Sequence, residues 1–282
     1  MKPLKATKHT FFWFEPKPYA LLMAGLIGLF CMSFEPVWKL ITKIEINSKE
    51  LQTDRIGNLY VVSNTNQLYK YDVNGKLVST LNYAYLGNIS SVDASNPMEL
   101  YLFYKELNAV VFLDNNLAYR GRLNLSDAGI TQSSAACRSY SNGIWVFDMG
   151  DLQLKKLNKD GSLSQASGNV LQFAQSKNLN PCQILDNGSR VFVNDTSEGI
   201  LVFDVFANYL KTIPIKGKES IRVMEKELYY LNQNKLISYK FSTMMRDTLT
   251  LPELNGEKFS VEKERLYLKN VGGISLYSYE NQ

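Results

Sequence analysis

The sequence predicts an all-β chain folded as a six-bladed β-propeller, and three observations support this prediction. An aromatic residue within a short apolar run returns about every 40 residues, which is typical of a propeller built from one four-stranded sheet per repeat. Turn-forming residues separate these runs from further apolar runs. Hydrophobic residues make up 45% of the chain, and its 17 Tyr and 14 Phe suit half-buried strands. The anchor aromatics are Tyr60, Tyr101, Trp145, Phe192, Tyr229 and Tyr267.

The first repeat illustrates the expected order of strands. The anchor strand GNLYVV (57–62) is followed by QLYKYD (67–72), and a turn at Asn74-Gly75 leads to an outer strand, LVSTL (77–81). Asn-Gly between apolar runs is a strong hairpin signal, because both residues tolerate positive φ. Less regular stretches before the anchors, such as SSVDA (90–94), fit the innermost strand. Four strands per repeat are therefore expected.

The ends of the repeat region indicate how the ring closes. The last repeat offers an inner strand at FSVE (259–262) and two further strands, but no outer strand follows them. The segment KLITKIEI (39–46) is strand-like and lies ahead of the first repeat. If it completes the last blade, the ring closes and two exposed sheet edges disappear. Six blades over residues 37–282 are predicted, with five or seven as the alternatives.

Residues 1–36 are predicted to be a signal peptide or an N-terminal membrane anchor. Lysines at the start are followed by an apolar run, 19–34, and by Glu35-Pro36, which is the layout of a secretory signal. Three alternatives remain open: a cleaved signal, a retained anchor helix, or a lipoprotein modified at Cys31. Each delivers the propeller across the membrane, so we expect an exported protein that is periplasmic or membrane-associated in a bacterial envelope.

The chemistry that the sequence offers is limited. The only histidine, His9, lies in the targeting segment, which argues against the usual Ser-His-Asp and Cys-His catalysis and against histidine-ligated metals. No EF-hand motif occurs, so no cofactor is expected, although calcium held by scattered carboxylates remains possible. The net charge of +4 comes mostly from the first 33 residues, which hold four lysines and one glutamate. A nucleic-acid partner is therefore not expected.

The charged residues of the predicted inner strands are the candidate site. Inner strands surround the axis of a propeller, so these side chains can line one mouth of the central channel and bind a polar ligand through carboxylates and guanidinium groups. The alternative is that they pair with one another and only hydrate the channel. The candidate ligand-binding residues are Asp54, Asp93, Arg138, Arg222 and Glu262.

Cys137 and Cys182 are expected on neighbouring inner strands. Adjacent inner strands bring Cα atoms within disulfide distance only in places. Two buried free thiols are the favoured interpretation, and a disulfide is the alternative.

The repeat GNLYVVSNTNQLYKYDVNGKLVST (57–80) resembles an NHL-type propeller repeat, and FLDNN (112–116) and VFDVF (202–206) echo it. The resemblance extends over about 48–282 but is specific in about one blade. It implies a six-bladed ring and no particular activity, because such rings serve as enzymes, ligand binders and scaffolds.

Two classes of function fit the sequence. The first is a non-catalytic protein-binding or scaffold propeller of the cell envelope, such as an accessory subunit of an outer-membrane secretion or motility complex, with an envelope protein as partner and membrane contact only through the N-terminal segment. The second is a hydrolase or lyase at the channel mouth, possibly calcium-dependent, that uses Asp54, Asp93 or Glu262 with Arg138 or Arg222. A small-ligand-binding propeller is a further alternative.

Overall fold

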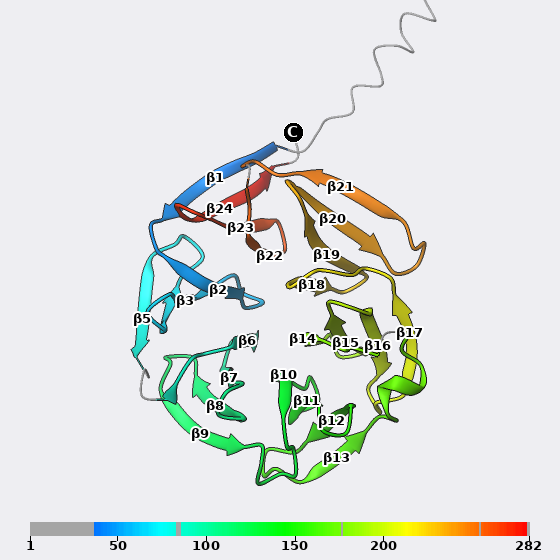
Figure 1. Cartoon of the computed structure of the whole chain (residues 1–282). Helices are drawn as coiled ribbons and strands as arrows, with labels where there is room; N and C mark the ends of the chain where they lie inside the picture. Colours follow the sequence, from blue (N-terminus) through cyan, green and yellow to red (C-terminus); the bar gives the residue numbers. More distant parts are fainter. Residues whose placement is uncertain (1–36, 83–85, 176, 254, 281–282) are drawn as a thin grey trace, which may run out of the picture. The chain divides into compact units, whose positions relative to one another are not determined.

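A computed structural model describes residues 37–82, 86–175, 177–253 and 255–280. Residues Trp38–Glu280 form one compact unit, in which six four-stranded antiparallel sheets are arranged around a central axis (Figure 1). The prediction of an all-β six-bladed β-propeller is confirmed. The predicted signal peptide or anchor at 1–36 lies outside the described residues. Within the part of the chain that is described, we find no helix both long and apolar enough to span a bilayer.

Each blade is built from four strands that run in sequence from the axis to the rim. The inner strands are β2 (Ser48–Thr53), β6 (Ser91–Asn96), β10 (Ser133–Arg138), β14 (Pro181–Asp186), β18 (Ile221–Met224) and β22 (Lys258–Glu262). The second strands are β3 (Leu59–Ser63), β7 (Glu99–Tyr104), β11 (Ile144–Asp148), β15 (Arg190–Asp195), β19 (Glu227–Asn232) and β23 (Arg265–Asn270).

The third strands are β4 (Gln67–Tyr71), β8 (Ala109–Asp114), β12 (Gln153–Leu157), β16 (Gly199–Asp204), β20 (Lys235–Lys240) and β24 (Gly273–Glu280). The outer strands are β5 (Leu77–Asn82), β9 (Tyr119–Asn124), β13 (Leu163–Ala166), β17 (Tyr209–Ile213), β21 (Arg246–Thr250) and β1 (Val37–Ile44). A short 3-10 helix, η2 (Val170–Gln172), lies between β13 and β14. All six anchor aromatics lie on second strands, as the repeat predicted.

The core lies between neighbouring blades. Apolar side chains from each pair of adjacent blades form a separate cluster of buried residues, six clusters in all among the described residues. Anchor aromatics such as Trp145 and Phe192 are fully buried in them. Blade 5 differs, because Leu228 and Tyr230 are its buried residues and the anchor Tyr229 is only partly buried. The side chain of Tyr229 is therefore available to the channel mouth.

The ring is closed by the strand that precedes the first repeat. β1 pairs with β24, and the last sheet has the order β1-β24-β23-β22 (Figure 1). The indole Nε1 of Trp38 donates a hydrogen bond to the carbonyl oxygen of Thr250 at 3.1 Å, which ties β1 to the outer strand of blade 5. The predicted closure is confirmed.

The antiparallel order within each blade assigns the turns to two faces. Turns that follow the inner strands, and turns that precede the outer strands, lie on one face, which we call the mouth face. The remaining connections lie on the opposite face. This assignment locates every turn residue discussed below.

Candidate functional site

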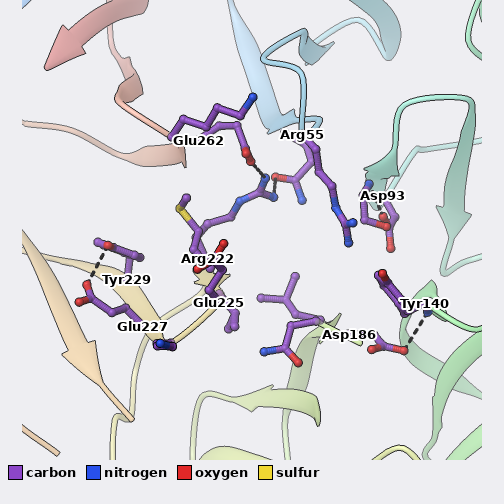
Figure 2. A pocket seen from close by; sticks show the side chains of 17 residues that line it. Arg55, Asp93, Tyr140, Asp186, Arg222, Glu225, Glu227, Tyr229 and Glu262 are labelled. Atoms are coloured by element: carbon purple, nitrogen blue, oxygen red, sulfur yellow. Dashed lines mark hydrogen bonds and ion pairs between the residues drawn. The ribbon is translucent and has the colours of Figure 1, made fainter. Parts of the chain in front are cut away.

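The turns after the inner strands surround a cavity of about 710 Å³ at the end of the channel, which we call the mouth cavity (Figure 2). All six blades contribute side chains to it. Aromatic side chains, Tyr140 and Tyr229, lie beside groups of both charges. The charged lining residues are Arg55, Asp93, Asp186, Arg222, Glu225, Lys226, Glu227, Glu262 and Lys263.

Arg222 of β18 crosses the channel below this cavity. Its guanidinium group donates to Oε1 of Gln52 (2.8 Å), to the carbonyl oxygen of Thr53 (3.1 Å) and to Oε2 of Glu262 (3.2 Å). Burial lowers the pKa of the Arg222 guanidinium, while Glu262 raises it. One side chain thus joins blades 5, 6 and 1 through charge-assisted hydrogen bonds.

The five predicted site residues do not all gather at the mouth. Asp93, Arg222 and Glu262 line the mouth cavity, whereas Asp54 and Arg138 do not. Whether these residues bind a ligand stays a prediction.

Asp54 is fully buried and shapes the turn between β2 and β3. Its carboxylate accepts hydrogen bonds from the backbone N–H groups of Ile56 (3.0 Å) and Asn58 (2.9 Å) and from the hydroxyl of Tyr60 (3.1 Å). Burial and the Asp54 charge raise the pKa of Tyr60 well above its usual range. The carboxylate is therefore fully engaged within its own blade.

Arg138 lies outside the cavity and joins two blades. Its side chain reaches Glu99, with an Nε–Oε2 distance of 3.8 Å, and Asn142, with an Nη2–Oδ1 distance of 3.4 Å. Its backbone N–H donates to Oδ2 of Asp93 at 2.7 Å, while Oδ1 of Asp93 accepts from the backbone N–H of Ser95 at 2.8 Å. Asp93 lines the cavity, but both of its oxygens already accept hydrogen bonds.

Three lining residues of the mouth cavity, Arg55, Tyr140 and Asp186, were missed by the sequence analysis. Each lies at the end of an inner strand or just after it. A search of the turns that follow the predicted inner strands, rather than of the strands alone, could have found them. Their side chains come together from blades 1, 3 and 4 (Figure 2).

Asp186 fixes the position of Tyr140. Its Oδ2 accepts from the backbone N–H of Tyr140 and from Nε1 of Trp145, both at 2.9 Å, and its Oδ1 accepts from the backbone N–H of Gly188 at 2.8 Å. The Tyr140 ring also rests on Gly188, where an added Cβ would lie 3.1 Å from the ring. The neighbouring blade thus holds this aromatic side chain at the cavity wall.

Blades 5 and 6 enter the cavity through two-residue turns. Glu225 and Lys263 adopt positive φ in these turns, +32° and +53°. Beside them the hydroxyl of Tyr229 donates to Glu227 at 2.8 Å. Burial, followed by this hydrogen bond and the Glu227 charge, raises the pKa of Tyr229 above its usual range, so the phenol stays protonated at neutral pH.

A second, smaller cavity of about 80 Å³ lies further along the axis and shares Gln52 and Asp93 with the mouth cavity. Both Cys137 and Cys182 line it, and both are free thiols, Cys137 buried and Cys182 partly buried. Burial raises the pKa of the Cys137 thiol, and burial together with nearby acids raises that of Cys182 to about 11. Both thiols are therefore protonated and weakly nucleophilic at neutral pH.

Across the described residues, no group of three or more His, Cys, Asp or Glu side chains is placed to hold a metal ion. The acids of the mouth cavity instead contact guanidinium groups, hydroxyl groups and backbone N–H groups.

Comparison with known proteins identifies the fold. No protein-family model matches the chain, and no curated protein matches it in sequence. Among solved structures, the chain is similar to a streptogramin B lyase, with a TM-score of 0.61 and 10% identity over 87% of this chain and 98% of that chain. It is also similar to the WD40 domain of Pan2 from Neurospora crassa, with a TM-score of 0.62 and 7% identity over 89% and 98%.

A third similar structure is a catalytically inactive histidine-to-alanine variant of virginiamycin B lyase from Staphylococcus aureus with quinupristin. Its TM-score is 0.56, with 11% identity over 86% of this chain and 99% of that chain. At such low identity these similarities establish the β-propeller fold alone. They do not test the NHL-type character of the repeats.

Proposed function

We propose that the protein is a non-catalytic docking propeller that binds a protein partner on its mouth face. The apolar side chains on that face carry the proposal. Six of the large hydrophobic residues that are exposed among the described residues belong to its turns, against three on the opposite face. The six are Ile56, Met98, Tyr140, Phe206, Met244 and Met245. Aromatic and Met side chains are enriched in the cores of protein interfaces.

The most exposed of them lie on blades 4 and 5. Phe206, between β16 and β17, is 66% exposed, and Met244 and Met245, between β20 and β21, are 64% and 63% exposed. Exposed apolar groups gain free energy when a partner removes them from water. The WD40 fold of one similar structure supports a binding role, since propellers of that type present their faces to other proteins.

The similarity to lyases does not favour catalysis in this chain. The variant of virginiamycin B lyase that lacks one histidine is described as inactive, whereas residues 37–282 contain no histidine at all. Four of the five acids at the mouth already accept hydrogen bonds: Asp93, Asp186, Glu227 and Glu262. A hydrolase or lyase would need an acid or base free to exchange a proton with its substrate.

The partner is assigned to the bacterial envelope by the predicted targeting segment. Export through residues 1–36 places the ring in the periplasm or at a membrane surface, where an accessory role in an outer-membrane secretion or motility complex fits a ring of this type. In this proposal membrane contact is made by the N-terminal segment, and the ring contacts proteins.

The proposal is tested by purifying the full-length tagged protein from membranes of its own host and quantifying what accompanies it. The triple variant F206S/M244S/M245S is compared with the wild type. We expect a stoichiometric envelope protein with the wild type and at least about a tenfold loss with the triple variant, because each buried apolar side chain contributes about 1.5–3 kcal/mol.

The matched control is L107S/V271S, which removes exposed apolar side chains from the opposite face. This control should retain the partner. Recovery of the wild type alone contradicts the docking function, and equal loss with both variants contradicts the choice of the mouth face.

A further inference from the structure

Arg55 extends into the mouth cavity from a rigid turn. It follows Asp54, whose buried carboxylate accepts the backbone N–H groups of Ile56 and Asn58, and the N–H of Gly57 donates to the carbonyl oxygen of Asp54 at 3.1 Å. The backbone at Arg55 is thus fixed on both sides although its side chain is exposed. Such a fixed backbone lowers the entropy cost of presenting the guanidinium group to a ligand.

The guanidinium group of Arg55 lies over the ring of Tyr140, with its Cζ atom 5.3 Å from the ring centroid. Tyr140 is in turn fixed by Asp186 and Gly188 of the next blade. A guanidinium group stacked on an aromatic ring keeps its N–H groups at the edge, where they can bind a carboxylate through two parallel hydrogen bonds. Among the described residues, no hydrogen bond or ion pair uses these N–H groups.

The charges around the cavity differ in whether they are already engaged. The acids Asp93, Asp186, Glu227 and Glu262 accept hydrogen bonds from the protein. The cations Arg55, Lys226 and Lys263 have no hydrogen-bond or ion-pair partner in the described part of the chain, and of the acids only Glu225 shares that condition. The unengaged groups are therefore mainly positive.

The two arginines of the mouth also repel each other. Figure 2 shows Arg55 and Arg222 pointing from different blades toward the middle of the cavity. The positive charge of Arg55 adds to burial in lowering the pKa of Arg222, against the effects of Glu262 and Asp93. A negative charge between the two guanidinium groups would relieve this repulsion.

We propose that the mouth cavity binds a carboxylate group, held by the edge of the Arg55 guanidinium where it lies over Tyr140, with Arg222 contributing charge from below. A monoanionic, planar carboxylate fits better than phosphate, because the five carboxylates that line the cavity repel a dianion more strongly. The volume of about 710 Å³ leaves room for the rest of the ligand. The carboxylate can belong to an acidic polypeptide segment or to a free organic acid, and the site does not depend on the docking function.

Isothermal titration calorimetry of the full-length protein tests this site with four probes: N-acetyl-L-glutamate, a short oligo-glutamate peptide with blocked ends, the matching oligo-glutamine peptide, and inorganic phosphate. We expect the two carboxylate probes to bind more tightly than the glutamine peptide and phosphate. Tighter binding of the peptide than of N-acetyl-L-glutamate assigns the carboxylate to a polypeptide, and equal binding assigns it to a small acid.

Variants identify the groups that hold the carboxylate. R55Q should weaken binding of the carboxylate probes about 10- to 100-fold, since hydrogen bonds between charged groups are being lost. Y140A should also weaken it, whereas Y140F retains the ring and should bind normally. The control R120Q removes an exposed arginine that pairs with Asp114 on β9, away from the cavity, and should bind as the wild type does.

Unchanged binding in a folded R55Q variant overturns the proposal, as does a wild type that binds neither carboxylate probe. Equal affinity for the glutamate and glutamine peptides overturns it as well. Circular dichroism of each variant confirms folding, and Arg55 is exposed, so its replacement should leave the ring intact.

Discussion

Asp54 is fully buried at the start of the turn between β2 and β3, where it accepts hydrogen bonds from two backbone N–H groups and from Tyr60. Asp93 and Asp186 act in the same way, since each accepts the backbone N–H two residues further on and one N–H from the neighbouring blade 3. Aspartates at the ends of strands stabilise turns by this pattern. At the scale of residues, these acids are therefore structural even where they line the cavity.

Glu253 gives this ring a pH-dependent contribution to stability. Its carboxylate accepts hydrogen bonds from Ser275 (3.0 Å), Tyr277 and Asn270. Burial raises the pKa of Glu253, but the three hydrogen bonds outweigh burial and hold the pKa below its ordinary value of 4.5. The folded state therefore binds fewer protons than the unfolded state in this range. The resulting stabilisation is complete above the ordinary value and is lost as the pH falls through the folded pKa.

We expect the free energy of unfolding of the wild type to fall more steeply between about pH 5 and pH 3 than that of E253Q, which has no charge to lose there. Urea unfolding at a series of pH values measures this. Parallel pH profiles for the two proteins would contradict this role of Glu253. E219Q, which replaces an acid on the connection to β18, is a matched control whose profile should follow that of the wild type.

At the scale of elements, two glycines dock the outer strands. Gly199 begins β16 and Gly273 begins β24, with φ of +111° and +132°. A Cβ at Gly199 would lie 2.6 Å from the carbonyl oxygen of Ile213 in β17, and one at Gly273 would lie 2.3 Å from that of Ile44 in β1. The same close approach therefore joins an outer strand to its blade in blades 4 and 6, although β1 comes from the other end of the sequence.

We expect G273A to destabilise the protein by about 2–3 kcal/mol, because Ala is strained at this φ and its Cβ would displace the backbone of β1. Urea unfolding measures the change. G217A is the control: Gly217 has a φ of +67°, but no atom lies within 4 Å of its added Cβ. Its cost should be limited to backbone strain of about 1 kcal/mol. Equal losses would mean that the contact with β1 contributes nothing.

The elements were predictable from local signals, whereas the site was predictable only in part. Apolar anchor runs, Asn-Gly turns and the strand-like segment at 39–46 can each be recognised without knowing their neighbours, and all of them occupy the predicted strands. The direction of a side chain on an inner strand depends on the adjacent blades. Arg138 turns to Glu99 and Arg222 crosses to Gln52 and Thr53, and neither contact is visible in the spacing of the sequence.

Arg55 and Tyr140 illustrate the same limit. They belong to turns of blades 1 and 3, so only the closed ring brings the guanidinium group over the aromatic ring. Asp54 was predicted to line the mouth because it precedes its anchor at a suitable spacing. Its carboxylate turns instead toward the N–H groups of its own turn, since a buried charge is stabilised by such donors.

At the scale of the whole molecule, blades 6 and 1 must be held together for the ring to stay closed. The hydroxyl of Tyr267 donates to the carbonyl oxygen of Gly57 at 2.8 Å, and the hydroxyl groups of Thr53 and Ser260 lie 2.7 Å apart. A buried cluster that includes Leu59, Val61 and Tyr267 fills the space between these blades. Because every blade packs on two neighbours, weakening this junction removes support from the entire ring.

Trp38 tests how far ring closure depends on β1. Its ring packs edge-on against Tyr279, with centroids 5.3 Å apart, and its indole N–H bonds to Thr250 of blade 5. W38A removes both contacts, and we expect it to lower the free energy of unfolding by about 2 kcal/mol. Leu40, on the same strand, is 52% exposed, so L40A should cost less than about 0.5 kcal/mol.

Hydrogen exchange shows whether that loss is shared by the ring. If closure is cooperative, W38A should accelerate the exchange of backbone amides in the second strands of all six blades by a similar factor, because those amides exchange only when the whole ring opens. Acceleration confined to β1, β24 and β21 would instead mean that the last blade opens alone. In that case β1 fastens only its own sheet, and the other five blades keep their packing without it.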